Sequence, residues 1–264
     1  MDLKNKRVLV TGSGTGLGSG IALNLAKNGA DVVIHFNRSK DRAEKTFELV
    51  SSYNSKSTLM QSDLTDVNSC KSLVDNAADF LGGLDSIVNN SGVTIPQHIS
   101  LITEEHFNNV MNINFRNYFF CAQAALPYLK KRIDQSSGCA SSQSSSIINI
   151  SSVHAKLGCP GHSLYAATKG AINSFTTQLA IELLDDRIRV NCVAPGTIEV
   201  ESYFDKDPLY TRDKGNSLVP WGRVGLPLEV GSLVSFLVSD ESEFMTGQTL
   251  YFDGGLTSKM AISL

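Results

Sequence analysis

The sequence lacks the features that mark nucleic-acid-binding, membrane and disulfide-bonded proteins. A net charge of only −3 gives no electrostatic reason to expect nucleic acid or an anionic membrane as a partner. Long hydrophobic runs are missing, so neither a signal peptide nor a membrane span is expected. The five cysteines are odd in number and widely spaced, and they contain no C-x-x-C pair, which predicts no disulfide framework and no metal site. The expectation is a soluble, cytoplasmic protein.

Internal repeats and linker-like segments are also missing. Along the 264 residues, short β-branched runs alternate with helical patterns of about ten to fifteen residues, and 42% of the residues are hydrophobic. This alternation predicts right-handed βαβ units and a parallel sheet that is covered on both faces. We therefore expect the α/β class: a single-domain Rossmann fold over residues 1–264, with a doubly wound parallel sheet of about seven strands and helices on both faces.

The first predicted strand runs into a glycine-rich turn. Residues 7–11, R-V-L-V-T, are followed by G-S-G-T-G-L-G-S-G and then by a helical pattern. The spacing G-x-G-x-x-G does not occur, but T-G-x-x-x-G-x-G does. In this context backbone N–H groups at a helix N-terminus can bind a pyrophosphate, although a flexible loop without a ligand is the alternative. The candidate cofactor-binding residues of the turn are Gly12, Ser13, Thr15, Gly16, Leu17 and Gly18.

The residues after the second predicted strand, 31–36, indicate which dinucleotide is bound. A carboxylate at this point binds the ribose 2′-hydroxyl of NAD and repels the 2′-phosphate of NADP. The sequence has Asn37 there, followed by Arg38 and Ser39. We therefore predict NADP, with NAD as the alternative, and place these three residues near the 2′-phosphate. The competing interpretation is that Arg38 is a solvated residue neutralised by Asp41.

Polar residues end the next two predicted strands, which cover residues 57–64 and 84–92. Because ligands of such sheets gather at the carboxyl ends of the strands, Asp63 is a candidate to accept from the adenine amino group. Further candidates at the same edge are Leu64, Asn90, Ser91 and Gly92. For Asn89 a structural role, tying loops together through its amide, is the stronger interpretation.

The composition of two further segments indicates no functional residue. Residues 103–132 are predicted to form one long helix, in which Asn112 and Asn114 look like ordinary packing residues. Residues 134–146 are rich in serine and contain no core-forming residues, so they are predicted to form an exposed, mobile loop without a function. The fifth strand is expected at 147–151.

The stretch from Ser152 to Gly170 contains the strongest catalytic pattern. Tyr165 and Lys169 are four residues apart in a helical pattern, which places both side chains on one helical face. An ammonium near a phenol stabilises the phenolate, so Tyr165 is a candidate general acid/base. Ser152 follows the fifth strand and can reach the same point to hydrogen-bond a substrate oxygen. The alternative is a surface helix that merely carries a Tyr and a Lys.

The remaining third of the chain continues the alternation of strands and helices. A sixth strand is predicted at 187–198, a helix at 228–238 and a last strand at 249–255. Residues 197–219 are polar and aromatic without a clear period, which is typical of a mobile flap over a site.

Together these motifs resemble the short-chain dehydrogenase/reductase family in its classical branch. The resemblance extends over essentially the whole chain: T-G-S-G-T-G-L-G in the first turn, N-N-S-G at 89–92, Asn114, Ser152, Y-A-A-T-K at 165–169, P-G-T-I at 195–198 and Y-F-D-G-G near the end. Each motif alone is weak, but their order and spacing are specific. Two departures stand out. Ser91 replaces the usual Ala, and Ser13 and Thr15 stand where many NADP-using members carry a basic residue.

The resemblance implies a role for each residue of the catalytic pattern. Tyr165 would be the general acid/base, Lys169 would assist it and bind the nicotinamide ribose, and Ser152 would hold the substrate oxygen. Asn114 would position a water in a proton relay. The residues beside the nicotinamide would be Pro195, Gly196 and Ile198. The resemblance also implies a small-molecule substrate and a homotetramer built on the long helices and the C-terminal strand.

Two subfamilies compete for the substrate. The pattern P-x-G-R-x-G-x-P at 220–227, with T-G-x-T-L-x-x-D-G-G-x-T at 246–257, is similar to sugar 1-dehydrogenases. The 3-oxoacyl-carrier-protein reductases look nearly as similar, but basic residues usually meet their acidic carrier at positions where this chain has Ser144, Ser145, Asp185 and Asp186. We predict a small hydroxylated substrate such as an aldose, and a non-catalytic NADP-binding regulator is the alternative of another class. The candidate substrate residues are Gln97, His154, His162, Glu201 and Tyr203.

Overall fold

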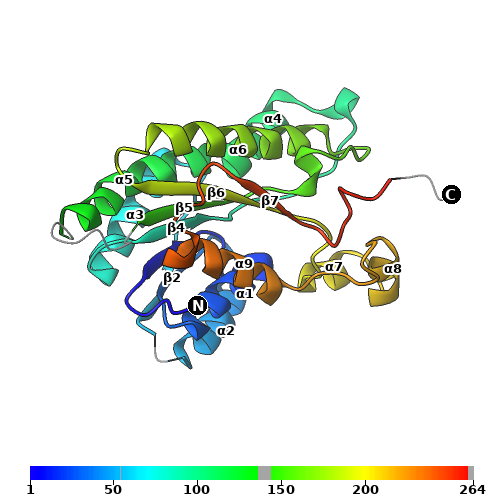
Figure 1. Cartoon of the computed structure of the whole chain (residues 1–264). Helices are drawn as coiled ribbons and strands as arrows, with labels where there is room; N and C mark the ends of the chain where they lie inside the picture. The colour runs from blue at the N-terminus through cyan, green and yellow to red at the C-terminus, as the bar shows by residue number, and fades with distance from the viewer. Residues whose placement is uncertain (54, 136–143, 261–264) are drawn as a thin grey trace.

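The sheet has the predicted doubly wound form. The structure, a computed structural model, describes residues 1–53, 55–135 and 144–260, and in these residues seven parallel strands form one sheet in the order β3-β2-β1-β4-β5-β6-β7 (Figure 1). The strands are β1 Arg7–Val10, β2 Asp31–Phe36, β3 Ser57–Gln61, β4 Ser86–Asn89, β5 Ser145–Ile150, β6 Ile188–Pro195 and β7 Thr249–Phe252. The strand order reverses beside β1, and the carboxyl ends of β1 and β4 are therefore the point where such sheets bind ligands.

Helices cover both faces of the sheet, as expected for a Rossmann fold. One face carries α1 Gly16–Lys27, α2 Lys40–Ser51 and α9 Pro227–Val238 (Figure 1). The other face carries α3 Val67–Leu81, α5 Asn117–Gln135 and α6 Ser163–Glu182. Within the described ranges, none of the helices combines the length and the apolar character that a membrane span requires.

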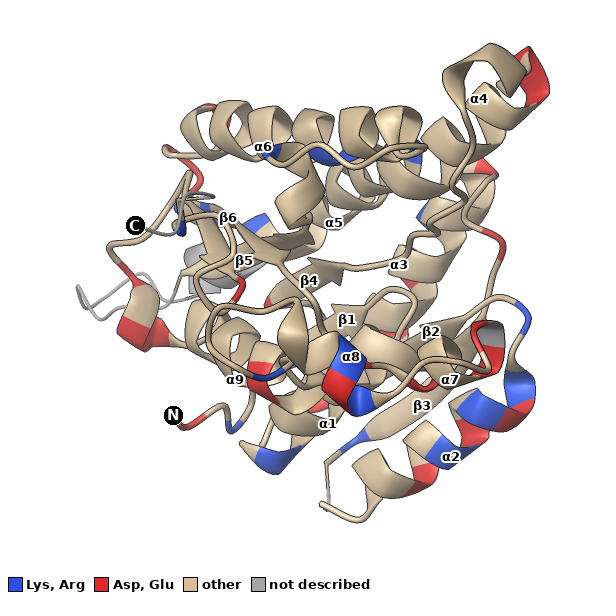
Figure 2. Cartoon of the chain, turned by 90° about the vertical axis from the view of Figure 1, so that its right-hand side faces the viewer, with Lys and Arg blue, Asp and Glu red and all other residues tan. Residues whose placement is uncertain are grey.

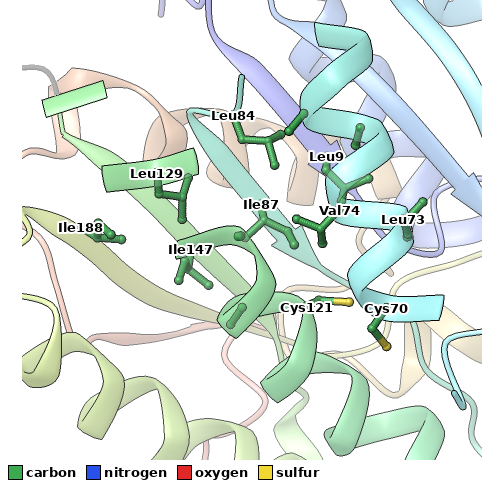
Figure 3. Packing of buried hydrophobic residues seen from close by; sticks show 14 of the residues in the cluster. Leu9, Cys70, Leu73, Val74, Leu84, Ile87, Cys121, Leu129, Ile147 and Ile188 are labelled. Atoms are coloured by element: carbon green, nitrogen blue, oxygen red, sulfur yellow. The ribbon is translucent and has the colours of Figure 1, made fainter. Parts of the chain in front are cut away.

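Alternating side chains of the strands enter two separate cores. On β1, Val8 and Val10 pack with α1 and α9, while Leu9 packs with α3 and α5 (Figure 3). On β5, Ile147 enters the same core as Leu9, and Ile148 enters the same core as Val8 and Val10. Because successive side chains of a strand point to opposite faces, a strand covered on both sides needs apolar residues at every position. This explains why the central strands read as unbroken β-branched runs rather than as an alternating pattern.

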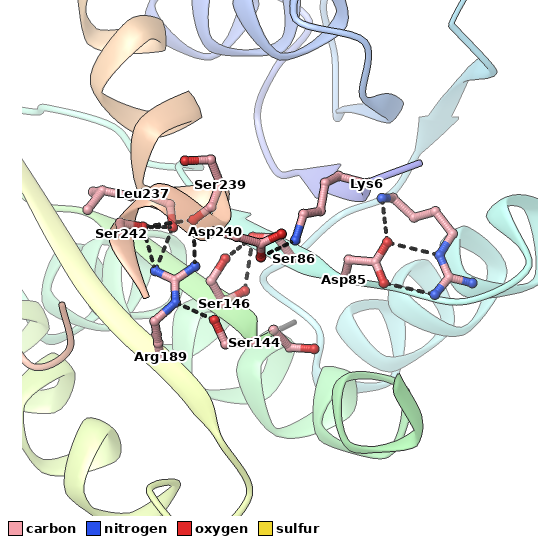
Figure 4. A network of polar contacts seen from close by, with 12 residues as sticks. Lys6, Asp85, Ser86, Ser144, Ser146, Arg189, Leu237, Ser239, Asp240 and Ser242 are labelled. Carbon is pink, nitrogen blue, oxygen red and sulfur yellow. Dashed lines mark hydrogen bonds and ion pairs between the residues drawn. The ribbon is translucent and has the colours of Figure 1, made fainter. Parts of the chain in front are cut away.

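The prediction for the serine-rich segment 134–146 is wrong at its ends. α5 continues to Gln135, and β5 begins at Ser145, which is fully buried. The hydroxyl of buried Ser144 accepts a 2.7 Å hydrogen bond from Nε of Arg189, which is itself buried (Figure 4). Buried serines are stable when each hydroxyl has a partner, and composition does not reveal such partners. The middle of the predicted mobile loop lies outside the described residues.

The long helix predicted for residues 103–132 consists of three parts. α4 Glu104–Met111 is followed by a π-helical turn at Asn112–Arg116, and α5 begins directly after it. Turns of this kind are rare and frequently lie at functional sites. The turn carries Asn114, whose side chain is completely buried. The helical pattern of the sequence therefore concealed the local change that makes this residue distinctive.

Two short helices lie within the segment 197–219, where an irregular loop was expected. α7 Glu201–Lys206 and α8 Arg212–Ser217 lie beyond one end of the sheet (Figure 1). The buried carboxylate of Glu199 accepts hydrogen bonds of 2.6 and 3.0 Å from the Arg212 guanidinium. This bidentate pair ties α8 to the chain that leaves β6. Movement of the segment as a flap stays a prediction.

Candidate active site

The glycine turn lies at the switch point of the sheet and fits a dinucleotide. A Cβ atom at Gly18 would lie 2.4 Å from the carbonyl oxygen of Gly12, so α1 approaches the turn more closely than a larger residue allows. At the start of α1, Thr15 caps no N–H group with its side chain, and the first turn contains no acidic residue. The N–H groups that open the helix at Gly16 and Leu17 and the positive end of its dipole are therefore available to a diphosphate.

Asn90 braces the glycine turn from the end of β4. Its side-chain amide donates hydrogen bonds to the carbonyl oxygens of Thr11 and Gly12 at 2.9 and 3.0 Å. In return, the Thr11 hydroxyl accepts the backbone N–H groups of Asn90 and Ser91 at 2.9 and 3.1 Å. The Asn90 side chain thus holds the turn in shape, and the direct contact with a cofactor that was expected for it stays a prediction. Asn89 has the structural role predicted, because its amide donates to Asn149 Oδ1 at 3.0 Å.

His35, the next-to-last residue of strand β2, supports the glycine turn, a role that the sequence did not indicate. Its Nδ1 accepts a 2.9 Å hydrogen bond from the N–H of Gly12, and its Nε2 donates to the carbonyl of Ser62 at 3.1 Å. Burial lowers the pKa of His35 to about 4, so the imidazole is neutral and can act as an acceptor. Ser13 is also turned inward, since its hydroxyl donates to the carbonyl of Val10 at 2.7 Å. Only tertiary contacts identify either role.

The candidates for the adenosine end of the cofactor come together where β2 and β3 end. The Asp63 carboxylate accepts hydrogen bonds from the backbone N–H and hydroxyl of Thr65, at 3.0 and 2.8 Å. These bonds, and more weakly the Asn37 amide and the Arg38 charge, lower the pKa of Asp63. Asn37 and Arg38 are therefore close to Asp63, because β2 and β3 are neighbouring parallel strands. Leu64 is buried beside them, and Ser39 precedes α2 as its N-cap residue.

Lys169 and Tyr165 face one another on α6. The Lys169 ammonium lies 5.6 Å from the centre of the Tyr165 ring and is almost completely buried. It donates a 3.0 Å hydrogen bond to the carbonyl of Ile150, the last residue of β5, which also accepts the hydroxyl of buried Tyr118 at 3.0 Å. The spacing of four residues thus produces the predicted arrangement, and the strand end fixes the ammonium beside the phenol. Tyr118 is a further residue that the sequence did not indicate.

Ser152 follows β5 at the same end of the sheet. It is buried, and its Oγ accepts the backbone N–H of His154 at 3.2 Å. This bond holds the hydroxyl oxygen in place and leaves its proton to donate to a substrate oxygen.

Asn114 connects the π-helical turn to the chain after β4. Its Oδ1 accepts the N–H of Val93, and its amide donates to the carbonyl of Val93, both at 2.8 Å. A Cβ atom at Gly92 would lie 3.3 Å from Asn114 Oδ1 and 3.7 Å from the ammonium of Lys169. Asn114 and Gly92 therefore border Lys169. A water-binding role for Asn114 stays a prediction.

Two of the five candidate substrate residues lie against Tyr165. The rings of His154 and His162 are stacked with their centres 4.8 Å apart, and the edge of His154 meets the Tyr165 ring at 5.5 Å. Burial and then the neighbouring His162 lower the pKa of His154. Tyr203 on α7 is half-buried, and burial followed by the charge of an ionised Tyr165 raises its pKa.

The other two substrate candidates, Gln97 and Glu201, do not contact Tyr165 in the interactions that the structure shows. The Gln97 side-chain amide donates to the carbonyl of Leu101 at 2.7 Å. Glu201 is exposed in the first turn of α7. Their role at the substrate therefore has less structural support than that of the two histidines.

The predicted nicotinamide side is formed by the chain that leaves β6. Pro195 ends the strand, and the N–H of Gly196 donates to the carbonyl of Phe252 on β7 at 3.0 Å. Ile198 is buried and forms an isolated parallel bridge with Gly225. This segment is thus fixed to its neighbours on the carboxyl side of the sheet.

Comparisons with known proteins agree with this geometry. A family model described as enoyl-(acyl carrier protein) reductase matches residues 12–257. Versicolorin reductase of Emericella nidulans is 34% identical over 266 residues, which cover 96% of this chain and 96% of that protein. Glucose 1-dehydrogenase 2 of Bacillus subtilis is 34% identical over 260 residues, which cover 97% of this chain and 96% of that protein.

A solved structure adds a cofactor to the comparison. A short-chain dehydrogenase from Burkholderia cenocepacia in complex with NADP has a TM-score of 0.86 and 30% identity to this chain, and the match covers 98% of this chain and 100% of that one. The match of fold and sequence extends through the glycine turn and the Tyr-Lys helix. The chain therefore belongs to the short-chain dehydrogenase/reductase family of oxidoreductases.

Proposed function

We propose that the protein transfers a hydride between NADP(H) and the carbonyl or secondary-alcohol carbon of a small hydroxylated molecule, with an aldose as the first candidate. The observation that carries this proposal is the buried ammonium of Lys169, 5.6 Å from the ring of Tyr165 and on the same helix. A phenol beside a buried cation is suited to give up and regain a proton.

Each of the three catalytic residues has a separate task in this proposal. Ser152 donates a hydrogen bond to the substrate oxygen and holds the reacting carbon in place. Tyr165 gives its proton to that oxygen during reduction and removes it during oxidation, and Lys169 stabilises the phenolate in between. Bound nicotinamide supplies or accepts the hydride. Asn114 is proposed to hold a water that returns protons to this group.

The imidazole pair supports a hydroxylated substrate. His154 and His162 stack against one another beside Tyr165, and Nδ1 of His162 is paired with the carbonyl of Pro160 at 2.9 Å. Neutral imidazoles offer a donor and an acceptor, which match the hydroxyl groups of a sugar. The relative named glucose 1-dehydrogenase 2 supports the same substrate class.

A hydroxylated aromatic ketone is the second candidate substrate. Tyr203 is half-buried and close enough to Tyr165 for an ionised Tyr165 to raise its pKa, so a flat ring could pack against its face. The relative named versicolorin reductase supports this alternative. The 3-oxoacyl thioesters remain a third class for the assay.

The test is a substrate panel followed through the absorbance of NADPH. Aldoses, hydroxylated aromatic ketones and 3-oxoacyl thioesters are compared by kcat/KM with the wild-type chain. Tyr165→Phe should abolish turnover of every accepted substrate, because the ring remains but the transferable proton is gone, while NADPH binding measured by fluorescence stays nearly unchanged. Unchanged turnover in this variant would refute the role of Tyr165.

Two further variants separate the two leading substrates. His162→Asn should lower kcat/KM for aldoses, whereas Tyr203→Leu should lower it for aromatic ketones and leave aldoses nearly unaffected. Loss of both activities in both variants would show that these side chains shape the site without selecting a substrate.

The expected homotetramer stays a prediction. Phe119 on α5 and Ile181 on α6 are 42% and 63% exposed, and apolar side chains on the long helices support an interface there.

A further inference from the structure

The glycine turn contains no cation for a 2′-phosphate. Ser13 and Thr15 occupy the positions where a basic residue would stand, and the Ser13 hydroxyl is bonded inward to the carbonyl of Val10. Arg38 is then the only cation expected at the phosphate from the sequence. An exposed arginine acting alone is a weak basis for selecting NADP over NAD. A second cation would have to come from an element that packs against the turn.

The first turns of α2 pack directly against the glycine turn. The hydroxyl of Thr46 donates to the carbonyl of Gly14 at 3.1 Å, and a Cβ atom at Gly14 would lie 2.8 Å from the Cβ of Ala43. Arg42 precedes Ala43 on this helix. Its side chain therefore starts next to the turn, on the side where β2 ends and the adenosine ribose is expected.

Arg42 is held by a carboxylate from the far side of the site. Its Nη2 lies 2.6 Å from Oδ2 of Asp205 on α7, and both side chains are partly exposed. Val200, the residue before α7, lies beside the glycine turn. A Cβ atom built on Gly16 would be 3.8 Å from its Cγ1. The helix α7 thus extends from the glycine turn to the start of α2, and Figure 2 shows α7 and α2 next to each other. Arg42 thus lies on the helix that packs against the glycine turn and is paired with an acidic side chain of the predicted flap.

We propose that Arg42 is a second cation for the 2′-phosphate of NADP and that Asp205 competes with this phosphate for the guanidinium. One guanidinium group can bind two oxygens of a phosphate at once through two N–H groups, and a phosphate carries more charge than a carboxylate. NADP can therefore draw Arg42 from Asp205, whereas NAD lacks the group that would do so. The inference rests on the use of NADP and is independent of which carbonyl compound is reduced.

The experiment measures dissociation constants of NADPH and NADH by fluorescence, without any substrate. Arg42→Ala should weaken NADPH binding about five- to tenfold and leave NADH binding unchanged, because one charge-assisted contact with the phosphate is lost. Asp205→Asn should strengthen NADPH binding about twofold, because the competitor is removed. In the double variant the effect of Asp205→Asn should vanish. The loss in Arg42→Ala should shrink in high salt.

Controls distinguish this role from general electrostatics and from misfolding. Lys40→Ala removes a charge from the same helix, but Lys40 is paired with Glu44 at 3.6 Å, so NADPH binding should stay within about twofold. Arg42→Lys keeps the charge and should retain part of the affinity.

Two results would overturn the proposal. Equal NADPH affinity in Arg42→Ala and wild type would remove Arg42 from the phosphate site. Weaker binding of both cofactors in both Arg42→Ala and Asp205→Asn would mean that the pair only holds the flap in place. Neither result depends on catalytic turnover, so the proposed function is tested separately.

Discussion

A fall in pH should lower the free energy of unfolding, because His35, the imidazole that supports the glycine turn, becomes protonated. Burial lowers the pKa of His35 from 6.5 to about 4. Between these values the unfolded chain binds a proton more readily than the folded one, so the contribution to stability is complete above pH 6.5 and is lost as the pH falls towards 4. At about 1.4 kcal/mol per pH unit, the free energy of unfolding loses about 3 kcal/mol from this group. Most of that loss should occur between pH 6.5 and 4.5.

Two variants of His35 separate its two hydrogen bonds. Asn can place an oxygen near the position of Nδ1 and keep the acceptor for the N–H of Gly12. Gln can place an amide near Nε2 and keep the donor to Ser62. Neither variant titrates, so urea unfolding followed by circular dichroism should show a flatter pH dependence for both than for the wild type. At pH 7, NADPH should bind more weakly to His35→Gln than to His35→Asn, because only the former leaves the N–H of Gly12 without its acceptor.

Parallel pH profiles in the wild type and both variants would refute this reasoning. They would mean that other groups cause the acid sensitivity and that His35 has the same proton affinity in both states. Equal NADPH affinity in the two variants would separately refute the supporting role of the bond to Gly12.

Two further predictions concern packing at the site. Gly18→Ala places a Cβ atom 2.4 Å from the carbonyl oxygen of Gly12, so NADPH titrations should show a loss of affinity of more than about tenfold. Gly170→Ala is the matched control, because no atom lies within 4 Å of its Cβ position and the helix α6 should gain up to about 1 kcal/mol. Tyr118→Phe removes one of the two donors to the carbonyl of Ile150, and urea unfolding should show a loss of about 1 kcal/mol. A loss of stability in Gly170→Ala, or none in Tyr118→Phe, would contradict these interpretations.

Local patterns sufficed to predict the architecture and the placement of Tyr165 beside Lys169. Apolar strands alternating with helices allow few arrangements other than a doubly wound sheet, because parallel strands need right-handed crossovers and cover on both faces. Tyr165 and Lys169 could be paired from their spacing alone, since a helix brings residues four apart onto one face. The glycine turn was recognisable because it follows a strand directly and opens a helix. All three inferences depend on neighbours in sequence.

Local patterns could not predict the surroundings of the serine-rich segment or of Asn114. Ser144 looked like part of an exposed loop because its partner, Arg189, lies on another strand. Asn114 looked like any helical asparagine, because a π-helical turn leaves the residue pattern of a helix almost unchanged. In both cases the decisive contact joins residues that are distant along the chain.

By itself, then, the sequence determined the class of fold, the position of the glycine turn and the side-by-side placement of Tyr165 and Lys169, because each is encoded by periodicity or spacing within one short segment. Only the tertiary structure decided that His35 and Asn90 hold the turn, that His154 and His162 stack on each other beside Tyr165 and that Arg42 meets Asp205. Hydrogen bonds and ion pairs between separate elements depend on how the elements pack, and no local pattern specifies that packing.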